Sequence, residues 1–598
     1  MEKPIIYQLL PRLWGNDSES RVCGGSLEEN GTGKFSDIDS PALEYFKWLG
    51  CTHIWFTGVI RHSTKSASCG CFPSNPQFVK GEAGSPYAIV DYFDVNPYLA
   101  SDPDRRMEEF EDIVRRTHEA GLKVIIDFVP NHVSRDYGKI EGGSGRTTLG
   151  DGDDTSVHWA HENDFFYYPG QGLTLPDTDA FLAECNAISS GDFSRAYSIL
   201  PAWLVRSCKE KYGNSSPEEY RRYLAENERL LTPYQEYPAK ATGNSYTPSP
   251  GVNDWYETVK INYCDTHSRT WDKMLAVLEF WIGKGVDGFR CDMVELVPWQ
   301  FMLWLIAEVK SGHPDIIFIA EVYKKDLYRK YIREVGFDYL YDKSGLYDTL
   351  RTVVEANLNS YGMPIELWQS ARGITRNWQY LGDIQPYMLN FLENHDEQRF
   401  ASDFFGKAAV NSIPALAVSL YINRAPFMIY AGEEMGERGM DQEGFSGRDG
   451  RTTIFDWWCV SSLKALRRLI ASGLYRSDGP WPDDLSEYRT FFRKFTDMIR
   501  FAASDEAVRK GMTYDLCYCN TNSEGFSIDK HFAFLRDHGD ETLLFVANFS
   551  TQPAEMKLKI PAHAFEWLEL APTESVNPDK PICISVPPVD MVMLCLSK

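Results

Sequence analysis

The chain is short of positive charge and of long apolar segments. It has 61 lysines and arginines against 85 aspartates and glutamates, so its formal net charge is −24. An acidic surface repels polyanions, which argues against nucleic acid and anionic membranes as partners. The most apolar late stretch, 413–422, meets Asn423 and Arg424 too soon to cross a bilayer. Neutral or cationic small molecules remain as the expected ligands.

The first residues lack the pattern of a secretory signal. The apolar run 5–10 is short and is interrupted by Tyr7 and Gln8. The 13 cysteines are an odd number without a regular framework, which favours free thiols in a reducing compartment. We therefore expect a cytoplasmic protein. Two cysteine pairs are spaced too tightly for a zinc site and are interpreted as plain thiols: Cys69 with Cys71, and Cys517 with Cys519.

Apolar runs alternate with amphipathic segments along most of the chain. Near-continuous Val, Ile and Phe runs are typical of parallel strands covered on both faces. The clearest of the intervening helices begins at Asp102, an N-cap, and ends at Gly121. The alternation predicts the α/β class and a (β/α)₈ TIM barrel, with a doubly wound sheet as the structural alternative. Eight runs are predicted to be the strands: 5–9, 53–60, 123–129, 288–292, 316–322, 337–341, 388–392 and 426–430.

Two segments interrupt this alternation. The first, 134–255, is too long for a structureless loop, and its stretch 179–228 is locally helical. It predicts an inserted B subdomain after the third strand. From 513 onward short strands predict a C-terminal antiparallel β-sandwich domain. Its strands are expected at 531–536, 542–549, 555–560, 582–586 and 591–596. We therefore divide the chain into a barrel (1–133 and 256–512), an insert (134–255) and a C-terminal domain (513–598).

Polar residues follow the ends of four predicted strands, where a barrel places its catalytic groups. Because these ends meet at one face, we expect one cluster of side chains rather than scattered charges. The residues concerned are Asp127, Asn131 and His132 after the third strand, Arg290 and Asp292 on the fourth, Glu321 after the fifth, and Asn394, His395 and Asp396 after the seventh.

Within this cluster, Asp292 and Glu321 have the properties that glycoside hydrolysis needs. Arg290 and Asp292 leave the same face of a strand, so the guanidinium is expected to keep Asp292 ionised. Like charge from Asp292 and Asp396 favours a protonated Glu321. One ionised and one protonated carboxyl are required for hydrolysis with retention. Each residue alone could be a structural ion pair or a cap, but the ordered combination favours function.

Four ordered segments of the chain resemble the signature segments of the α-amylase superfamily of glycoside hydrolases (glycoside hydrolase family 13). The resemblance covers the whole barrel, and the insert and C-terminal domain stand where that family carries its B and C domains. Gly84-Ser-Pro-Tyr87 is similar to the family's segment after strand two, and 426–433 to its strand eight. The four segments are Asp127-Phe-Val-Pro-Asn131-His132, Gly288-Phe-Arg290-Cys-Asp292, Ala320-Glu321-Val322 and Asn394-His395-Asp396.

The resemblance implies a role for each matching residue. Asp292 is the nucleophile, Glu321 the general acid and base, and Asp396 the stabiliser of the transition state. The other roles implied are stacking under the sugar for Tyr87, hydrogen bonds to its hydroxyls for His132 and His395, orientation of Asp292 for Arg290, and support of Arg290 for Asp127.

A structural calcium ion is the one metal that the resemblance implies, and the chemistry itself requires no cofactor. Asn131 keeps the place of a calcium ligand. The chain departs from the family pattern after the nucleophile, where Met293-Val294-Glu295-Leu296 replaces the Lys-His of many α-amylases. The resemblance therefore does not extend to the acceptor-side contacts or to the one carbonyl ligand of the calcium site that the family has at these positions.

Taken together, these residues predict a retaining α-glycosidase that acts on α-1,4-glucans or maltooligosaccharides. The expected partner is an oligosaccharide, and the sequence sets no oligomeric state. Hydrolysis and transfer share the glycosyl–enzyme, so a 4-α-glucanotransferase or a maltosyltransferase is the close alternative. A non-catalytic glucan-binding or accessory barrel is the remote one.

Overall fold

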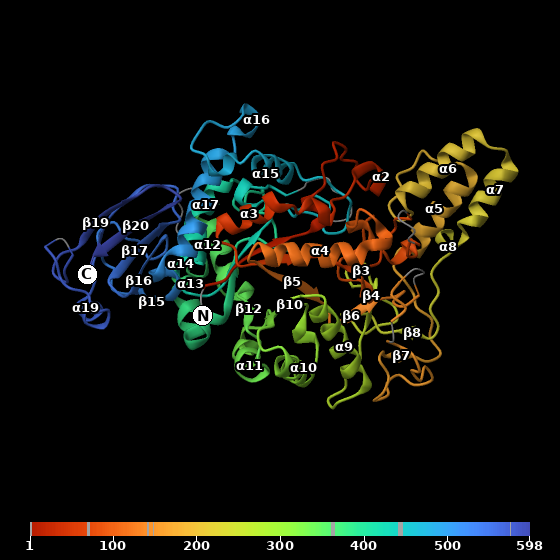
Figure 1. The fold of residues 1–598 in the computed structure, drawn as a ribbon, viewed down its shortest axis with the longest axis horizontal. Coiled ribbons are helices and arrows are strands. Elements are labelled where there is room, and N and C mark those ends of the chain that lie inside the picture. Colours follow the sequence, from red (N-terminus) through yellow and green to blue (C-terminus); the bar gives the residue numbers. More distant parts are fainter. Residues whose placement is uncertain are drawn as a thin grey trace.

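Eight parallel strands close into a barrel in the computed structural model of the chain (Figure 1). The structure describes residues 3–67, 72–139, 143–146, 149–359, 365–439, 447–574 and 576–597. The closed ring confirms the predicted (β/α)₈ barrel and rules out the doubly wound alternative. Around the ring the strands are β1 (Ile5–Leu9), β14 (Phe427–Tyr430), β13 (Met388–Phe391), β12 (Tyr339–Tyr341), β11 (Ile317–Ala320), β10 (Gly288–Cys291), β5 (Lys123–Phe128) and β2 (His53–Phe56).

The prediction of a single strand over 53–60 is wrong. β2 ends at Phe56, and Gly58 follows with a φ of 76°. That left-handed conformation turns the chain out of the barrel, and glycine adopts it without steric cost. Ile60 begins a separate strand, β3 (Ile60–His62), which pairs antiparallel with β4 (Ile89–Val95). The segment after the second barrel strand is therefore a β-hairpin beside the mouth of the barrel.

Amphipathic helices cover the outside of the barrel. Asp102 begins one of them as expected: its side chain accepts a hydrogen bond from the Asp104 N–H at 3.1 Å. A short 3₁₀ turn follows, and then α4 (Arg106–Glu119) buries Phe110 and Ile113 against the strands. Other helices around the barrel include α3 (Ser40–Leu49), α9 (Arg269–Gly283), α10 (Trp299–Gly312), α12 (Asp348–Asn359), α14 (Ile413–Tyr421) and α17 (Arg489–Ser504).

The inserted segment combines two small strand pairs with a helical bundle. β6 (His132–Ser134) pairs with β9 (Thr258–Lys260), and β7 (Tyr167–Tyr168) with β8 (Ala239–Lys240). The bundle has an apolar core of its own, and Figure 1 places it at the end of the molecule away from the C-terminal domain. Three of its helices coincide with the stretch 179–228 that was expected to be helical: α5 (Thr178–Ser190), α6 (Ala202–Asn214) and α7 (Pro217–Glu226). A fourth, α8 (Glu228–Leu231), begins only at the last residue of that stretch.

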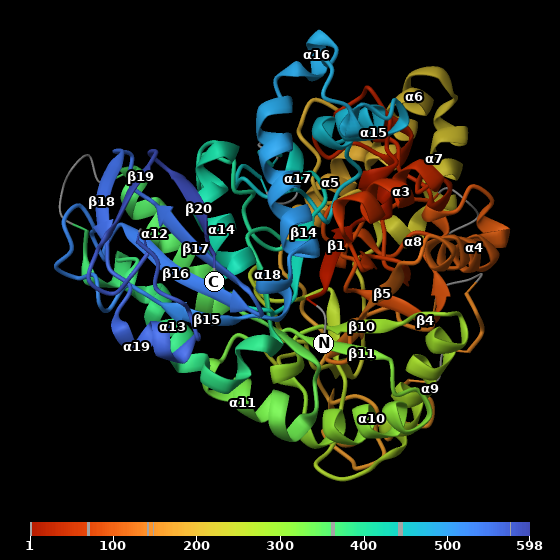
Figure 2. The same cartoon turned by 60° about the vertical axis from the view of Figure 1, so that its left-hand side comes forward.

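The C-terminal region forms the predicted antiparallel β structure, in which β15 was not anticipated. Figure 2 shows α14 beside the C-terminal sheet. Tyr421 of this helix stacks on Phe545 with ring centroids 4.7 Å apart, so the region packs on the barrel through α14. One sheet has the order β15 (Met512–Asp515), β16 (His531–His538), β17 (Glu541–Asn548) and β20 (Asp590–Ser597), and the other pairs β18 (Ala554–Leu558) with β19 (Ile582–Val586).

Several buried cysteines are free thiols, as the sequence predicted. Cys517 and Cys519 are both unbridged, whereas Cys69 and Cys71 lie outside the described residues. In the part of the chain that the structure describes, no helix combines the length and the apolar character needed to cross a membrane.

A buried ion pair joins the beginning of the insert to its end. Arg135, just after β6, has a fully buried side chain, and its Nη1 lies 3.0 Å from Glu236 Oε1. Its Nη2 donates to Thr242 Oγ1 at 2.9 Å and its Nε to the Tyr256 carbonyl at 2.5 Å. Each nitrogen of the guanidinium therefore has a partner, either in the later part of the insert or at Tyr256, just before β9.

We predict that Glu236→Ala destabilises the protein by about 3–5 kcal/mol, because it leaves the Arg135 charge buried without its counterion. Thermal unfolding followed by circular dichroism measures the effect. Glu226→Ala is the matched control, since Glu226 forms only an exposed pair with Arg222 at 4.0 Å. Equal melting temperatures for the two variants would contradict the prediction.

Candidate active site

The residues predicted to form the site do meet at the carboxyl ends of the barrel strands. The register places Arg290 beside Asp127, and Cys291 beside both Phe128 and Ala320. Asp292 and Glu321 are the next residues after β10 and β11, so the chain directions aim both at the mouth of the barrel. The mouth contains a cavity of about 300 Å³, and the predicted residues that line it are Tyr87, His132, Asp292, Glu321 and Asp396.

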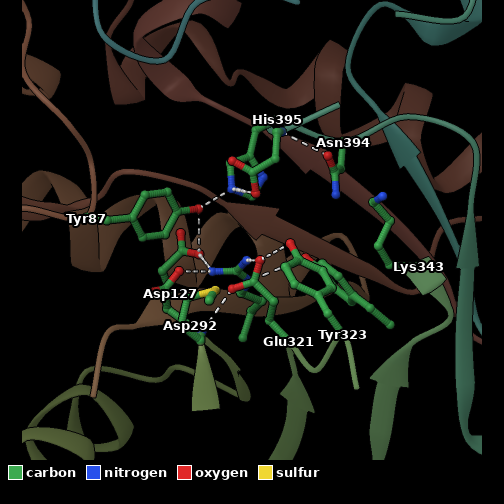
Figure 3. A network of polar contacts seen from close by, with 12 residues as sticks. Tyr87, Asp127, Asp292, Glu321, Tyr323, Lys343, Asn394 and His395 are labelled. Carbon is green, nitrogen blue, oxygen red and sulfur yellow. Dashed lines mark hydrogen bonds and ion pairs between the residues drawn. The ribbon is translucent and has the colours of Figure 1, made fainter. Parts of the chain in front are cut away.

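A single guanidinium joins the two proposed catalytic acids. Arg290 is fully buried, and its Nη1 donates to Asp292 Oδ1 at 2.7 Å. Its Nη2 lies 2.9 Å from Glu321 Oε1, an ion-pair distance without hydrogen-bond alignment. Because one planar group holds both carboxyls, Asp292 and Glu321 lie within reach of the same bound atom (Figure 3).

Three aromatic rings enclose this guanidinium. The Arg290 Cζ lies 5.6 Å from the ring centroid of Trp55, 5.4 Å from that of Tyr87 and 5.5 Å from that of Tyr341. Ring faces attract cations, most strongly where water is excluded. Arg290 Nε also lies 3.3 Å from the Tyr341 hydroxyl. The cage fixes the orientation of Arg290, and Trp55 and Tyr341 were not foreseen in this role.

Asp127 supports Arg290 mainly through the cage. It lies 3.9 Å from Arg290 Nη1, too far for a hydrogen bond. Its carboxylate instead accepts hydrogen bonds from Trp55 Nε1 at 3.2 Å and from the Tyr87 hydroxyl at 3.4 Å. Burial raises the pKa of Asp127 to about 6, against the opposing charge of Arg290.

Glu321 receives two further hydrogen bonds. The Met293 N–H donates to Oε2 at 2.9 Å, and the Tyr323 hydroxyl donates to Oε1 at 2.6 Å. Met293 has a φ of 44°, a left-handed conformation that a non-glycine residue rarely adopts and that turns its N–H toward Glu321. Tyr323 was missed in the sequence, although its position two residues after Glu321 was a usable signal.

The pKa of Asp292 differs from what the sequence predicted. Burial, and then the charge of Glu321, raise the pKa of Asp292 well above its usual range, although Arg290 opposes them. The same two causes raise the pKa of Asp396 to about 7. The expectation that Arg290 keeps Asp292 ionised is therefore wrong, because burial and the charge of Glu321 outweigh the guanidinium. With a pKa of about 7, Asp396 is partly protonated near neutral pH.

His395 is held as a neutral imidazole with a defined orientation. Burial lowers its pKa well below the usual range, and the charge of Arg290 adds to this. Gln8, at the end of β1, lies with its Nε2 2.7 Å from His395 Nδ1. The opposite ring nitrogen contacts the Tyr87 hydroxyl and lies 3.2 Å from Asp396 Oδ2. Gln8 was not predicted, although a polar residue inside an apolar strand marked it.

His132 occupies the other side of the pocket and is also neutral. Burial, followed by the charges of Lys260 and Lys80, lowers its pKa to about 3. Its ring packs against Trp255, with centroids 5.2 Å apart. A neutral imidazole can exchange hydrogen bonds with sugar hydroxyls without competing for the proton of the acid cluster.

The surroundings of Asn131 do not fit a calcium ion. The Lys260 Nζ donates to Asn131 Oδ1 and, at 2.7 Å, to the Leu296 carbonyl. Burial lowers the pKa of Lys260 to about 7, but the amine occupies the coordination position of the Asn131 oxygen in either charge state. Among the described residues, no group of three or more His, Cys, Asp or Glu side chains could hold a metal ion.

Comparisons with known proteins agree with this geometry. The family described as "Alpha amylase, catalytic domain" matches residues 25–168 and 257–551, and "Maltogenic Amylase, C-terminal domain" matches residues 527–592. "Alpha-amylase 3" of Dictyoglomus thermophilum is 25% identical over 444 residues, which cover 73% of this chain and 64% of that protein. The match therefore spans slightly less than two thirds of that relative's length.

Two other comparisons cover nearly the full chain. "Amino acid transporter heavy chain SLC3A1" of Homo sapiens is 21% identical over 631 residues, covering 96% of this chain and 76% of that protein. The crystal structure of the maltogenic α-amylase AmyB from Thermotoga neapolitana superposes with a TM-score of 0.55 at 16% identity, covering 100% of this chain and 96% of that one. With the acid cluster at the mouth of a closed barrel and the catalytic-domain match over most of the chain, the protein belongs to the α-amylase family.

Proposed function

We propose that the protein is a retaining α-glycosidase that hydrolyses α-1,4-linked glucans or maltooligosaccharides. The observation that carries this proposal is Arg290, which binds Asp292 at 2.7 Å and lies 2.9 Å from Glu321 at the edge of one cavity. A structural ion pair would need only one of these carboxylates. Two acids held by one cation beside an open pocket fit a nucleophile and a proton donor acting on the same bond.

In the proposed mechanism, the Asp292 carboxylate forms a bond to the anomeric carbon of the bound sugar. Glu321 gives its proton to the glycosidic oxygen, so the bond between that oxygen and the anomeric carbon breaks and the leaving sugar departs as an alcohol. A water molecule then attacks the same carbon. Glu321 takes a proton from this water, the bond to Asp292 breaks, and the product keeps its α configuration.

The remaining residues of the pocket bind and orient the sugar in this proposal. The Tyr87 ring lies on one side of Asp292, and Tyr323 lies beside Glu321 on the other (Figure 3). Tyr87 therefore supports the donor sugar by stacking, and Tyr323 orients the carboxyl of the acid. Asp396, whose side chain is 38% exposed toward the pocket, is placed to bind hydroxyls and to stabilise the positive charge of the transition state.

A maltoheptaose digest tests the function. We expect the first product sugar to appear as the α-anomer by proton NMR and all products to be shorter than the substrate. Products longer than maltoheptaose would instead assign the enzyme to glucan transfer. If maltoheptaose binds but is not cleaved, the result favours the alternative of a non-catalytic glucan-binding or accessory protein.

The two acids can be distinguished by the leaving group. We expect Glu321→Gln to lower kcat on maltoheptaose by roughly 10²–10⁴-fold, because protonation of the leaving oxygen is lost. The same variant should lose far less on α-maltosyl fluoride, since fluoride departs without a proton. Asp292→Asn should fail on both substrates. Equal losses for Glu321→Gln on the two substrates would refute its role as the acid.

We also propose that the enzyme works without calcium, because Lys260 takes the place that the family resemblance gives to the metal. Chelation with EDTA and later addition of calcium should change neither kcat nor the melting temperature. Lys260→Met should lower stability by about 1–3 kcal/mol, because the Asn131 and Leu296 oxygens lose their buried donor. A melting temperature that falls with EDTA would contradict the proposal.

A further inference from the structure

A thin partition separates the catalytic cavity from a second cavity of about 350 Å³. Both cavities are lined by the segments 79–85, 255–257 and 454–456, and they share no lining residue. Different residues of these segments face the two sides. Lys80, Ser85, Trp255, Glu257, Ile454 and Phe455 line the catalytic cavity, whereas Val79, Gly81, Glu82, Tyr256 and Asp456 line the second one.

The partition is held closed by backbone contacts. The Ala83 and Gly84 N–H groups donate to the Phe455 carbonyl at 2.8 and 3.1 Å. Gly81 has a φ of 65°, and a Cβ there would lie 2.3 Å from the same carbonyl oxygen. Glycine at 81 therefore lets the two segments approach without a gap. A sugar chain could not pass between them unless these hydrogen bonds broke.

A buried ion pair forms part of the face toward the catalytic cavity. The Lys80 Nζ lies 3.0 Å from Glu257 Oε2, and the two side chains are 11% and 6% exposed. The Lys80 Nζ also lies 5.0 Å from the Tyr256 ring centroid. Glu257 Oε2 is buried against the Lys80 ammonium, so Glu257 fixes the position of that charge beside the cavity.

The partition lies on the donor side of the proposed cleavage point. Lys80 and Ser85 precede the donor-stacking Tyr87 on the same segment, and the charge of Lys80 contributes to lowering the pKa of His132. Trp255 packs on the His132 ring. Glu321 and Tyr323 lie beyond Asp292 from Tyr87, on the side of the leaving group (Figure 3). The end of the donor ring away from the anomeric carbon thus points toward the partition.

We propose that this partition ends the donor side of the pocket, so that the enzyme attacks glucans from their non-reducing end, with Lys80 and Glu257 as the residues that recognise that end. The inference rests on the proposed glycosidase function and adds its direction of attack. Lys80 donates a hydrogen bond to a terminal hydroxyl oxygen, and Glu257, whose Oε2 lies 3.0 Å from the Lys80 Nζ, holds the ammonium in place. The cavity of about 300 Å³ is at the small end of ligand pockets, roughly 300–1,000 Å³, as a closed end requires.

The test compares two heptasaccharides that are modified at opposite ends. Maltoheptaitol has a reduced reducing end, and the second substrate is a maltoheptaoside whose terminal 4- and 6-hydroxyls carry an ethylidene cap. We expect the wild-type enzyme to cleave maltoheptaitol and to cleave the capped substrate at least about 100-fold more slowly, since one misplaced methylene in a pocket already costs roughly 10–200-fold. The earliest products from maltoheptaitol should include one short sugar of fixed length.

Two double variants test the residues. K80A/E257A removes both side chains without leaving an unpaired charge, and it should raise the rate on the capped substrate to within about tenfold of the rate on maltoheptaitol. K80M/E257Q keeps the volume of the wall without its charges. It should still reject the cap, while its KM for maltoheptaitol rises by about tenfold or more. K557A/E524A, which breaks an exposed pair at 2.6 Å in the C-terminal domain, is the matched control and should behave as wild type.

The outcomes separate this inference from the proposed function. If wild type cleaves neither substrate, the glycosidase function fails and the direction of attack fails with it. If wild type cleaves both substrates at similar rates, the function stands and the closed end is overturned. Should K80A/E257A not fold, rejection of the cap by wild type together with the raised KM of K80M/E257Q supports the proposal. An unchanged KM in K80M/E257Q refutes the role of the two residues.

Discussion

The buried charge of Arg290 is the constraint around which the site is organised. A guanidinium taken out of water is costly unless its surroundings replace the lost hydration. Here the replacement comes from the Asp292 and Glu321 carboxylates and from the rings of Trp55, Tyr87 and Tyr341. These groups come from different barrel strands and the loops beyond them. The closed ring of strands is therefore what brings the chemistry together, and each acid is held by a cation that is itself fixed.

Much of the barrel and of the acid cluster could be predicted from the sequence, because both depend on local patterns. Asp292 and Glu321 directly follow apolar strands, and parallel strands in a barrel share one direction, so their positions followed from the fold. The strand over 53–60 failed because a single glycine, Gly58, ends it in the middle of an apolar run. The raised pKa of Asp292 was also missed, because it depends on burial that the strand pattern alone does not reveal.

Residues on irregular segments escaped prediction for a different physical reason. Lys80, Trp255 and Glu257 lie in segments without strand or helix periodicity, and they meet only because the insert returns to the barrel beside the hairpin that follows β2. Lys260 is comparable: an isolated lysine in a short apolar strand gives no indication that its amine will reach Asn131 and Leu296. Gln8 and Tyr323 differ from these, since Gln8 is a polar residue inside an apolar strand and Tyr323 lies two residues after Glu321.

The helical bundle α5–α8 has its own apolar core, built around Phe181, Ile188 and Leu204. It also falls between the two stretches matched to the family's catalytic domain, 25–168 and 257–551. Polar contacts nevertheless join the bundle to the segments that follow β3: Trp203 Nε1 donates to the Lys65 carbonyl at 2.8 Å, and the Ala202 N–H donates to Glu82 Oε2 at 3.2 Å. Because Tyr197, Ser198 and Ile199 beside this bundle line the second cavity, a change of sequence there would reshape that cavity, while the acids line a different one.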